Sequence, residues 1–323
     1  MPPLVPCCAG AASPWTARPP MHNTRTLGHV LALITIAFWG TTYVSTKVLL
    51  GAFTPVEILL WRFLLALAAL FLVKPKPFTG TSPRHELTMA LAALCGICLY
   101  YLLENEALVY TTASNAAVIV CVAPCFTALL SVPVLKAKLP SVRFYLGFAM
   151  AMVGIALVSW TGASLEVNPL GDLLALLAAL AWGFYAVLSR ITANYGYPTI
   201  LVTRRMFEYG LLFMIPFAVG SGAKLNLAPF ADPVILCNMI FLGLGASALC
   251  FVTWNQAVRL IGPVQTSVYI YLTPVVTVTT AALILDERMT PVAVLGTVLT
   301  LAGLIVSESR KRRNRTDRQR SGE

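Results

Sequence analysis

Apolar residues occur in long, nearly continuous runs separated by short polar breaks. The runs cover residues 27–49, 54–73, 86–108, 113–132, 140–160, 169–191, 197–219, 233–257, 262–284 and 291–308. Most of them have the length that an α-helix needs to cross the apolar core of a bilayer. The run 173–180 shows no strict alternation of the kind found in membrane β-strands. The pattern predicts an all-α polytopic membrane protein with ten transmembrane helices.

The positive charges fall mainly into every second break. With the N-terminus placed in the cytoplasm, 17 Lys and Arg residues lie on the cytoplasmic side, and Lys224 and Arg288 lie outside. Cytoplasmic loops of membrane proteins are enriched in Lys and Arg. We therefore expect both termini in the cytoplasm and the protein in a bacterial cytoplasmic (inner) membrane.

Residues with distinctive chemistry recur in order in the second half of the chain. At an offset of 143 residues, Trp39-Gly40 matches Trp182-Gly183 and Arg62 matches Arg205. At an offset of 150, Asn105 matches Asn255 and Pro124 matches Pro274. At an offset of 149, Gly147 matches Gly296 and Gly154 matches Gly303. Each half holds five expected helices, so the second half must enter the membrane from the opposite side. The sequence therefore predicts two inverted five-helix repeats, an architecture used for alternating access.

The repeats divide the chain into four parts. Residues 1–26 form a Pro-rich extension that we expect to be disordered, 27–160 the first repeat, 169–308 the second repeat, and 309–323 a basic cytoplasmic tail. Met1 and Met21 both remain candidate translation starts.

The amino-acid composition excludes several classes of protein. Only 11% of the residues are charged and 58% are hydrophobic, whereas soluble domains carry about 25% charged residues. Seven of the 23 Lys and Arg residues lie in the tail, so the net charge of +10 does not indicate a nucleic-acid partner. Six of the eight cysteines lie inside apolar runs, where packing is the expected role. This composition and charge distribution do not suit a soluble enzyme, a disordered chain or a nucleic-acid binder.

Several local motifs resemble the EamA family of the drug/metabolite transporter superfamily. They are Ala37-Phe38-Trp39-Gly40, Trp61-Arg62-Phe63, the stretch 104–111, Ala113-Ser114-Asn115-Ala116-Ala117 leading to Ala123-Pro124, Gly262-Pro263 leading to Leu272-Thr273-Pro274, and Asp286-Glu287-Arg288. The resemblance covers both repeats, about 27–308. It implies a ten-helix transporter of small metabolites, often amino acids or related compounds, without naming the substrate.

Two arginines lie within predicted helices. Arg62 is about 12 Å inside the second helix from its outer end, and Arg205 holds the equivalent place in the seventh helix. Ionisable side chains at such depth are costly and usually functional. A guanidinium there can grip a carboxylate or phosphate, or it can hold helices in register as a structural ion pair.

Acidic residues lie at matching depths. Glu104 is within expected reach of Arg62, and Glu208 follows Arg205 by three residues on the same helix face. One hypothesis makes them protonatable groups that couple transport to protons. The alternative makes them salt-bridge partners of Arg62 and Arg205.

A larger set of aromatic and amide side chains completes the expected substrate site. Besides the two Arg–Glu pairs, its members are Trp39, Tyr43, Tyr101, Asn105, Asn115, Trp182, Tyr185, Trp254, Asn255, Gln265 and Tyr269. Polar groups at this depth must face protein or water. Pro124 and Pro274 lie within predicted helices and should kink them, which makes both candidate hinges.

The functional hypothesis is a secondary active exporter of small metabolites working by alternating access. Its partners are a small-molecule substrate and the lipid bilayer, with protons as a candidate coupling ion, and monomer and homodimer both stay open. The sequence contains no GxxxxGK[ST], HExxH or GxSxG motif. Cys95 and Cys98 form a CxxC, but it has no second pair or nearby His, so neither cofactor nor metal is expected. The alternatives are a nucleotide-sugar or sugar-phosphate exchanger of the same superfamily and, in another class, an intramembrane lipid-modifying enzyme.

Overall fold

The computed structural model describes residues 21–110, 119–158, 168–276, 279 and 291–308. The described regular elements are helices: α1 (Met21–Leu49), α2 (Pro55–Val73), α3 (Pro83–Ala93), η1 (Leu94–Leu99), α4 (Tyr100–Tyr110), α6 (Ala123–Leu135), α7 (Val142–Val158), α8 (Pro169–Asn194), α9 (Thr199–Gly220), η2 (Ala228–Ala231), α10 (Pro233–Ile240), η3 (Phe241–Leu249), α11 (Cys250–Ile261), α12 (Pro263–Ser267), η4 (Val268–Leu272) and α14 (Pro291–Glu308). Most of these helices coincide with expected apolar runs. One expectation is wrong: α1 begins at Met21, so residues 21–26, assigned to the disordered extension, are helical.

Several helices begin with the same local signal, a capping side chain followed by proline. Thr54 and Glu57 form a reciprocal capping box at the start of α2, with Pro55 in its first turn. Asn168 caps α8 in front of Pro169. A capping oxygen satisfies exposed backbone N–H groups, and proline suits the first turn because its missing N–H is not needed there. The breaks between the apolar runs therefore also position the helix starts.

Two long helices contain a π-helical segment at equivalent places. η1 joins α3 to α4, and η3 joins α10 to α11. Leu94, the first residue of η1, corresponds to Leu244 within η3 at the repeat offset of 150. π-Helical turns are rare and often mark functional sites. The apolar pattern predicted these helices but not their π-helical segments.

The two candidate hinge prolines lie at breaks in helical geometry. Pro124 stands in the first turn of α6, directly after the turn at Cys121-Val122. Pro274 follows the 3₁₀ segment η4. Proline cannot donate a backbone hydrogen bond and clashes with the preceding helical turn. Whether these breaks act as hinges stays a prediction.

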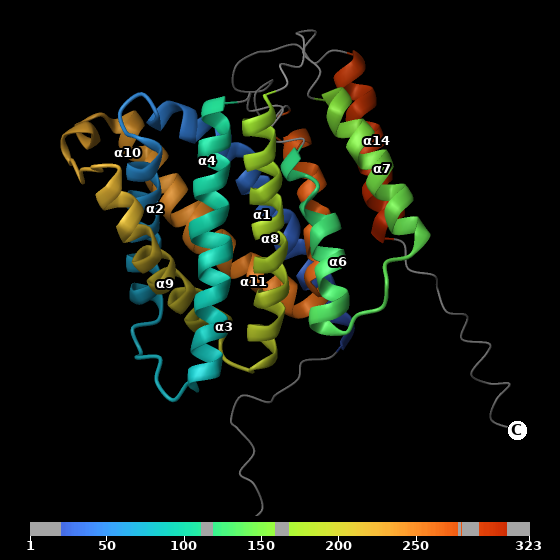
Figure 1. Cartoon of the computed structure of the whole chain (residues 1–323), viewed down its shortest axis with the longest axis horizontal. Helices are drawn as coiled ribbons and strands as arrows, with labels where there is room; N and C mark the ends of the chain where they lie inside the picture. Colours follow the sequence, from blue (N-terminus) through green and yellow to red (C-terminus); the bar gives the residue numbers. More distant parts are fainter. Residues whose placement is uncertain (1–20, 111–118, 159–167, 277–278, 280–290, 309–323) are drawn as a thin grey trace, which may run out of the picture.

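Helices from the two halves of the chain pack against each other throughout the bundle. α1 packs along α11, α4 and α6 pack on α8, and α2 packs on η3 and α9. α7 and α14 form a close pair at one edge, opposite α2, α9 and α10 (Figure 1). Gly154 lies so close to Thr300 that an added Cβ would come within 2.5 Å of its backbone nitrogen. Small residues of this kind let membrane helices approach closely.

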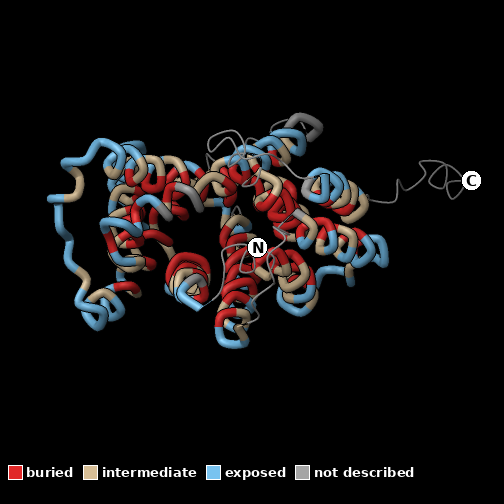
Figure 2. The backbone as a smooth tube through the Cα atoms, turned by 90° about the horizontal axis from the view of Figure 1, so that it is seen from above, coloured by how far each residue is buried: buried red, intermediate tan, exposed pale blue. Residues whose placement is uncertain are grey.

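The exterior is suited to lipid. Buried residues line the inside of the bundle and exposed ones its outside (Figure 2). Four described helical stretches are long and apolar enough to cross a membrane: Pro55–Val73, Pro83–Ala107, Pro169–Asn194 and Pro233–Ile261. α9 has 22 residues but carries Arg204, Arg205 and Glu208. The chain is thus a helical membrane protein, while the count of ten spans remains a prediction.

Candidate functional site

The equivalent tryptophans of the two repeats meet near the centre of the bundle. The ring centroids of Trp39 on α1 and Trp182 on α8 are 5.2 Å apart, edge to face. Trp254 of α11 lies 5.1 Å from Trp39 and 5.5 Å from Trp182. With their neighbours they form what we call the central aromatic cluster: Trp39, Tyr100, Tyr101, Trp182, Tyr185, Phe251 and Trp254. Trp39 and Trp182, which are 143 residues apart in the sequence, thus belong to the same cluster.

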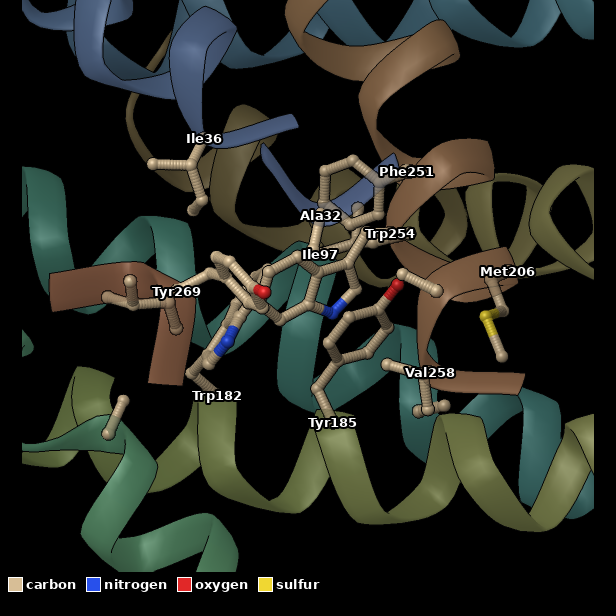
Figure 3. Close-up of a cluster of buried hydrophobic side chains, with 14 of the residues drawn as sticks. Ala32, Ile36, Ile97, Trp182, Tyr185, Met206, Phe251, Trp254, Val258 and Tyr269 are labelled. Carbon is tan, nitrogen blue, oxygen red and sulfur yellow. The ribbon is translucent and has the colours of Figure 1, made fainter. Parts of the chain in front are cut away.

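The backbone around the cluster holds its rings in place. Trp39 Nε1 donates to the carbonyl oxygen of Ala246 within η3, at 2.9 Å. Tyr185 packs directly over Gly96 of η1, where an added Cβ would lie 2.3 Å from its ring. Trp182 and Tyr185 extend from α8 toward Trp254 (Figure 3). Both π-helical segments therefore contact the cluster.

Asn255 holds Tyr185 rather than facing an open cavity. The Tyr185 hydroxyl donates to Asn255 Oδ1 at 2.8 Å, and Asn255 Nδ2 donates to Thr203 Oγ1 at 3.0 Å. Asn255 thereby links α8, α9 and α11. Its repeat partner Asn105 is half-buried on α4.

Two indole donors in the cluster have no acceptor within the part of the chain that the structure describes. They are Nε1 of Trp182 and Nε1 of Trp254, both buried, and their residues are 3% and 0% exposed. Leaving a buried polar group unpaired costs about 1–3 kcal/mol. Two such donors at one place suit a ligand that carries acceptor oxygens.

Arg62 borders the cluster and is only 4% exposed. Its Nε donates to Ser247 Oγ at 2.9 Å, and its guanidinium carbon lies 4.8 Å from the ring centre of Tyr101. Within the described residues no carboxylate lies at ion-pair distance from Arg62, so the expected pairing with Glu104 is wrong for this structure. Among the described residues, the guanidinium is held by the Ser247 hydroxyl and the aromatic face of Tyr101.

Glu104 contacts the same cluster through Tyr100, whereas Arg62 contacts it through Tyr101. The Tyr100 hydroxyl donates to Glu104 Oε1 at 2.8 Å, and Tyr100 packs 4.8 Å from Trp182. The rings of Tyr100 and Tyr101 are 5.0 Å apart. A buried cation and a buried carboxylate therefore each contact one of two adjacent tyrosines.

Arg205 does not join Arg62, contrary to the symmetric site that the repeat predicts. Arg205 Nη1 pairs with Glu208 at 2.8 Å, and Nη2 donates to the Phe78 carbonyl oxygen at 2.7 Å. The salt-bridge interpretation of Glu208 is thus the one the structure shows. The physical reason is the residue that the neighbouring helix supplies. Ser247, the partner of Arg62, corresponds at offset 150 to Ile97, which has no hydroxyl.

The Arg205 cluster also contains residues that the sequence analysis passed over. Arg204, 2% exposed, donates to the carbonyl oxygens of Lys74 and Lys76 and stacks on Phe71. Glu86 pairs with Arg205 at 3.5 Å. Phe71 is nine residues from Arg62 along α2, about 14 Å. This network attaches the α2–α3 connection to α9 and lies apart from the central aromatic cluster.

The remaining candidates lie in varied places. Tyr269 is buried, and its hydroxyl lies 2.8 Å from His29 Nδ1. Gln265 lines a separate cavity at one end of the bundle. Asn115 and the side chain of Tyr43 lie outside the described residues.

Ser247 and Phe251 also belong to the central region but were not among the sequence candidates, and Tyr100 was considered only as one of the surrounding aromatic residues. Tyr100 precedes Tyr101 directly, and Phe251 corresponds to Tyr101 at offset 150, so the repeat contained a usable signal for both. Within the described residues no three His, Cys, Asp or Glu side chains come together as a metal site.

Comparison with known proteins agrees with the helical fold. A model of the EamA-like transporter family matches residues 26–160 and 169–308. A protein of Archaeoglobus fulgidus described as an uncharacterized transporter is 28% identical, with 90% of this chain and 99% of that protein covered. A solved structure titled only as a crystal structure of a protein shares the fold with a TM-score of 0.73, at 19% identity, over 90% of this chain and 99% of that one.

Two further relatives have more specific names. A probable terminal-alkyne amino-acid exporter of Streptantibioticus cattleyicolor is 26% identical, over 86% of this chain and 92% of that protein. A probable amino-acid metabolite efflux pump of Escherichia coli is 24% identical, over 86% and 93%. These names describe transporters rather than enzymes. Because the family model matches most of the sequence, once in each half, this chain belongs to the EamA-like transporter family.

Proposed function

We propose that this protein is a secondary active exporter of small amphoteric metabolites, such as amino acids or related compounds. The observation that carries the proposal is the central aromatic cluster, with two unpaired indole donors and buried Arg62 and Glu104 at its border. Arg62 would bind a carboxylate, and Glu104 would bind an ammonium group. The names of the two exporter relatives support this substrate class.

Alternating access would follow from ten spans arranged as two inverted repeats. Equivalent contacts support this arrangement: Gly40 packs against Val276, and Gly183 packs against Phe126. The glycines are 143 residues apart and their partners 150 apart, which are the offsets of the repeat. Trp182, Tyr185 and Trp254 are almost fully buried, so a substrate reaches them only when the halves move. Glu104 is then the candidate carrier of a coupling proton.

An exchanger for nucleotide sugars or sugar phosphates gains no support from the cluster. Such substrates carry one or more phosphates and favour several cationic partners. Arg62 is the arginine that contacts the cluster, while Arg204 and Arg205 are occupied by carbonyl oxygens and Glu208. One guanidinium suits a single carboxylate better.

Replacing Trp182 or Trp254 by phenylalanine should reduce export about tenfold, because a hydrogen bond to a charged group contributes roughly 1.5–3 kcal/mol. The ring is retained, so the melting temperature should change little. The measurement is efflux of each of the standard amino acids, tested singly, from preloaded proteoliposomes.

Trp61→Phe is the matched control. Its Nε1 is also buried and unpaired, but the ring packs 5.2 Å from Phe230, outside the central aromatic cluster. Equal losses in all three variants would contradict a role for the two cluster indoles. Failure of the wild-type protein to move any amino acid would remove the proposed substrate class.

The topology makes a separate prediction. Under the proposed ten-span arrangement in a bacterial inner membrane, a reporter fused after Lys224 should lie outside, and one fused after Glu323 should lie in the cytoplasm. The excess of Lys and Arg on one side is the physical reason. Paired alkaline phosphatase and fluorescent protein fusions measure this, and a cytoplasmic signal after Lys224 would overturn the arrangement.

A further inference from the structure

A cavity of about 520 Å³ lies at one end of the bundle, away from the central aromatic cluster. It is open to the surface and is lined by the start of α1, the ends of α6 and α8, and the turn between α11 and α12. All of these ends lie on the cytoplasmic side in the proposed topology. Its polar lining includes Arg25, Arg190, Asn194 and Gln265. Gln265 therefore belongs to this cavity rather than to the centre.

The cavity is positively charged and carries hydrogen-bond donors. Neither Arg25 nor Arg190 forms an ion pair within the described residues, and the described lining contains no carboxylate. Each arginine presents five N–H donors in a planar fork that matches phosphate oxygens. Two guanidinium groups and two carboxamides thus line one open pocket.

Both arginines are partly oriented by neighbours. Arg190 Nη1 donates to the carbonyl oxygens of Val258 at 3.3 Å and Arg259 at 2.6 Å, at the end of α11. With the Gln265 amide oriented to pair both of its atoms, its oxygen accepts from Arg25 Nη2 at 3.3 Å and its nitrogen donates to Ile261 O at 2.9 Å. These bonds use one nitrogen of each guanidinium and leave the other two for a ligand.

The chain turn beside the cavity brings these groups together. Gly262 has φ of 90°, a conformation that glycine adopts without strain, and Pro263 follows it. The turn places Gln265 next to the end of α11, which Arg190 contacts. Leu135 and Leu260 add apolar surface at the same rim. The pocket therefore combines apolar side chains with two guanidinium groups.

We propose that this cavity binds the phosphate group of an anionic phosphate ester at the cytoplasmic face. Basic pockets between membrane helices on this side suit anionic lipid headgroups. A soluble phosphate ester presents the same chemistry to the two guanidinium groups. The bound phosphate connects α1, α8 and the α11–α12 turn, and so stabilises this end of the bundle.

The test measures binding to the full-length purified protein in detergent. Dioleoylphosphatidylglycerol is titrated against dioleoylphosphatidylcholine by thermal shift and native mass spectrometry, and glycerol 3-phosphate provides the soluble arm. We expect phosphatidylglycerol to raise the melting temperature and Arg25→Gln to weaken its binding at least fivefold. Arg190→Lys, which retains the charge, should weaken binding less than Arg190→Gln.

Arg84→Gln is the matched control, because it removes one exposed positive charge at the start of α3, outside the cavity. It should leave binding unchanged. Binding of phosphatidylglycerol without glycerol 3-phosphate supports a lipid source, and binding of both supports any phosphate ester. Binding that is absent, or that falls equally in Arg84→Gln and Arg25→Gln, overturns the proposal.

Discussion

Arg62→Lys should lower transport at least tenfold while the protein still inserts and folds. Lysine keeps the positive charge but lacks the planar fork that grips a carboxylate and stacks on an aromatic face. The Arg62 guanidinium lies 4.8 Å from the Tyr101 ring centre, so the aromatic contact is already present, while its Nε donates to Ser247. The grip on a carboxylate belongs to the proposed substrate complex. Transport is measured in proteoliposomes at matched protein density, with the exposed Arg143→Lys as the control.

The same position distinguishes a substrate-binding role from a structural ion pair. Removing one partner of a buried ion pair costs about 3–5 kcal/mol, whereas removing both can be nearly neutral. Because Glu104 is held by Tyr100 and not by Arg62, the effects of Arg62→Ala and Glu104→Ala on melting temperature should add. Recovery of both stability and transport in the double variant would make Arg62 a structural residue.

Gly96→Ala should destabilise the protein by about 1–3 kcal/mol, the usual cost of overpacking, and should reduce transport strongly. The new Cβ would lie 2.3 Å from the ring of Tyr185, which cannot move aside without losing its bond to Asn255. The change therefore displaces Tyr185 and so disturbs the central aromatic cluster. Thermal unfolding in detergent and efflux from proteoliposomes are the two measurements.

Gly220→Ala is the matched control, since no atom lies within 4 Å of the Cβ that it would add in α9. Gly220 is the last residue of α9, where the preference of helix interiors for alanine applies only in part, so this variant should be nearly neutral. If Gly96→Ala behaved in the same way, the close contact with Tyr185 would have no energetic importance.

The helices themselves could be predicted from the sequence because the membrane permits few alternatives. A backbone in lipid must satisfy its hydrogen bonds internally, so a long apolar run becomes a helix. The capped starts at Thr54 and Asn168 are equally local. The repeat also predicted that Trp39 and Trp182 hold equivalent places, and the structure brings them into contact.

The partners of the charged side chains could not be predicted in this way. Arg62 and Arg205 are equivalent in the repeat, yet one borders the cluster and the other binds Glu208 and the Phe78 carbonyl oxygen. The difference comes from Ser247 and Ile97, which approach from other helices. Such contacts join residues far apart in the sequence, and no local pattern specifies them.

The sequence by itself determined the helical class, most helix positions and the matching of the family model in each half, and it supplied the candidate residues of the proposed substrate site. The tertiary structure alone decided which of them meet: Arg62 with Ser247 and Tyr101, Glu104 with Tyr100, and Gln265 with the cavity of Arg25 and Arg190. Helix formation in lipid depends on residues that are close together in the sequence, because the backbone hydrogen bonds are made within the segment. Side-chain partnership depends on how rigid helices pack, and that is a property of the whole bundle.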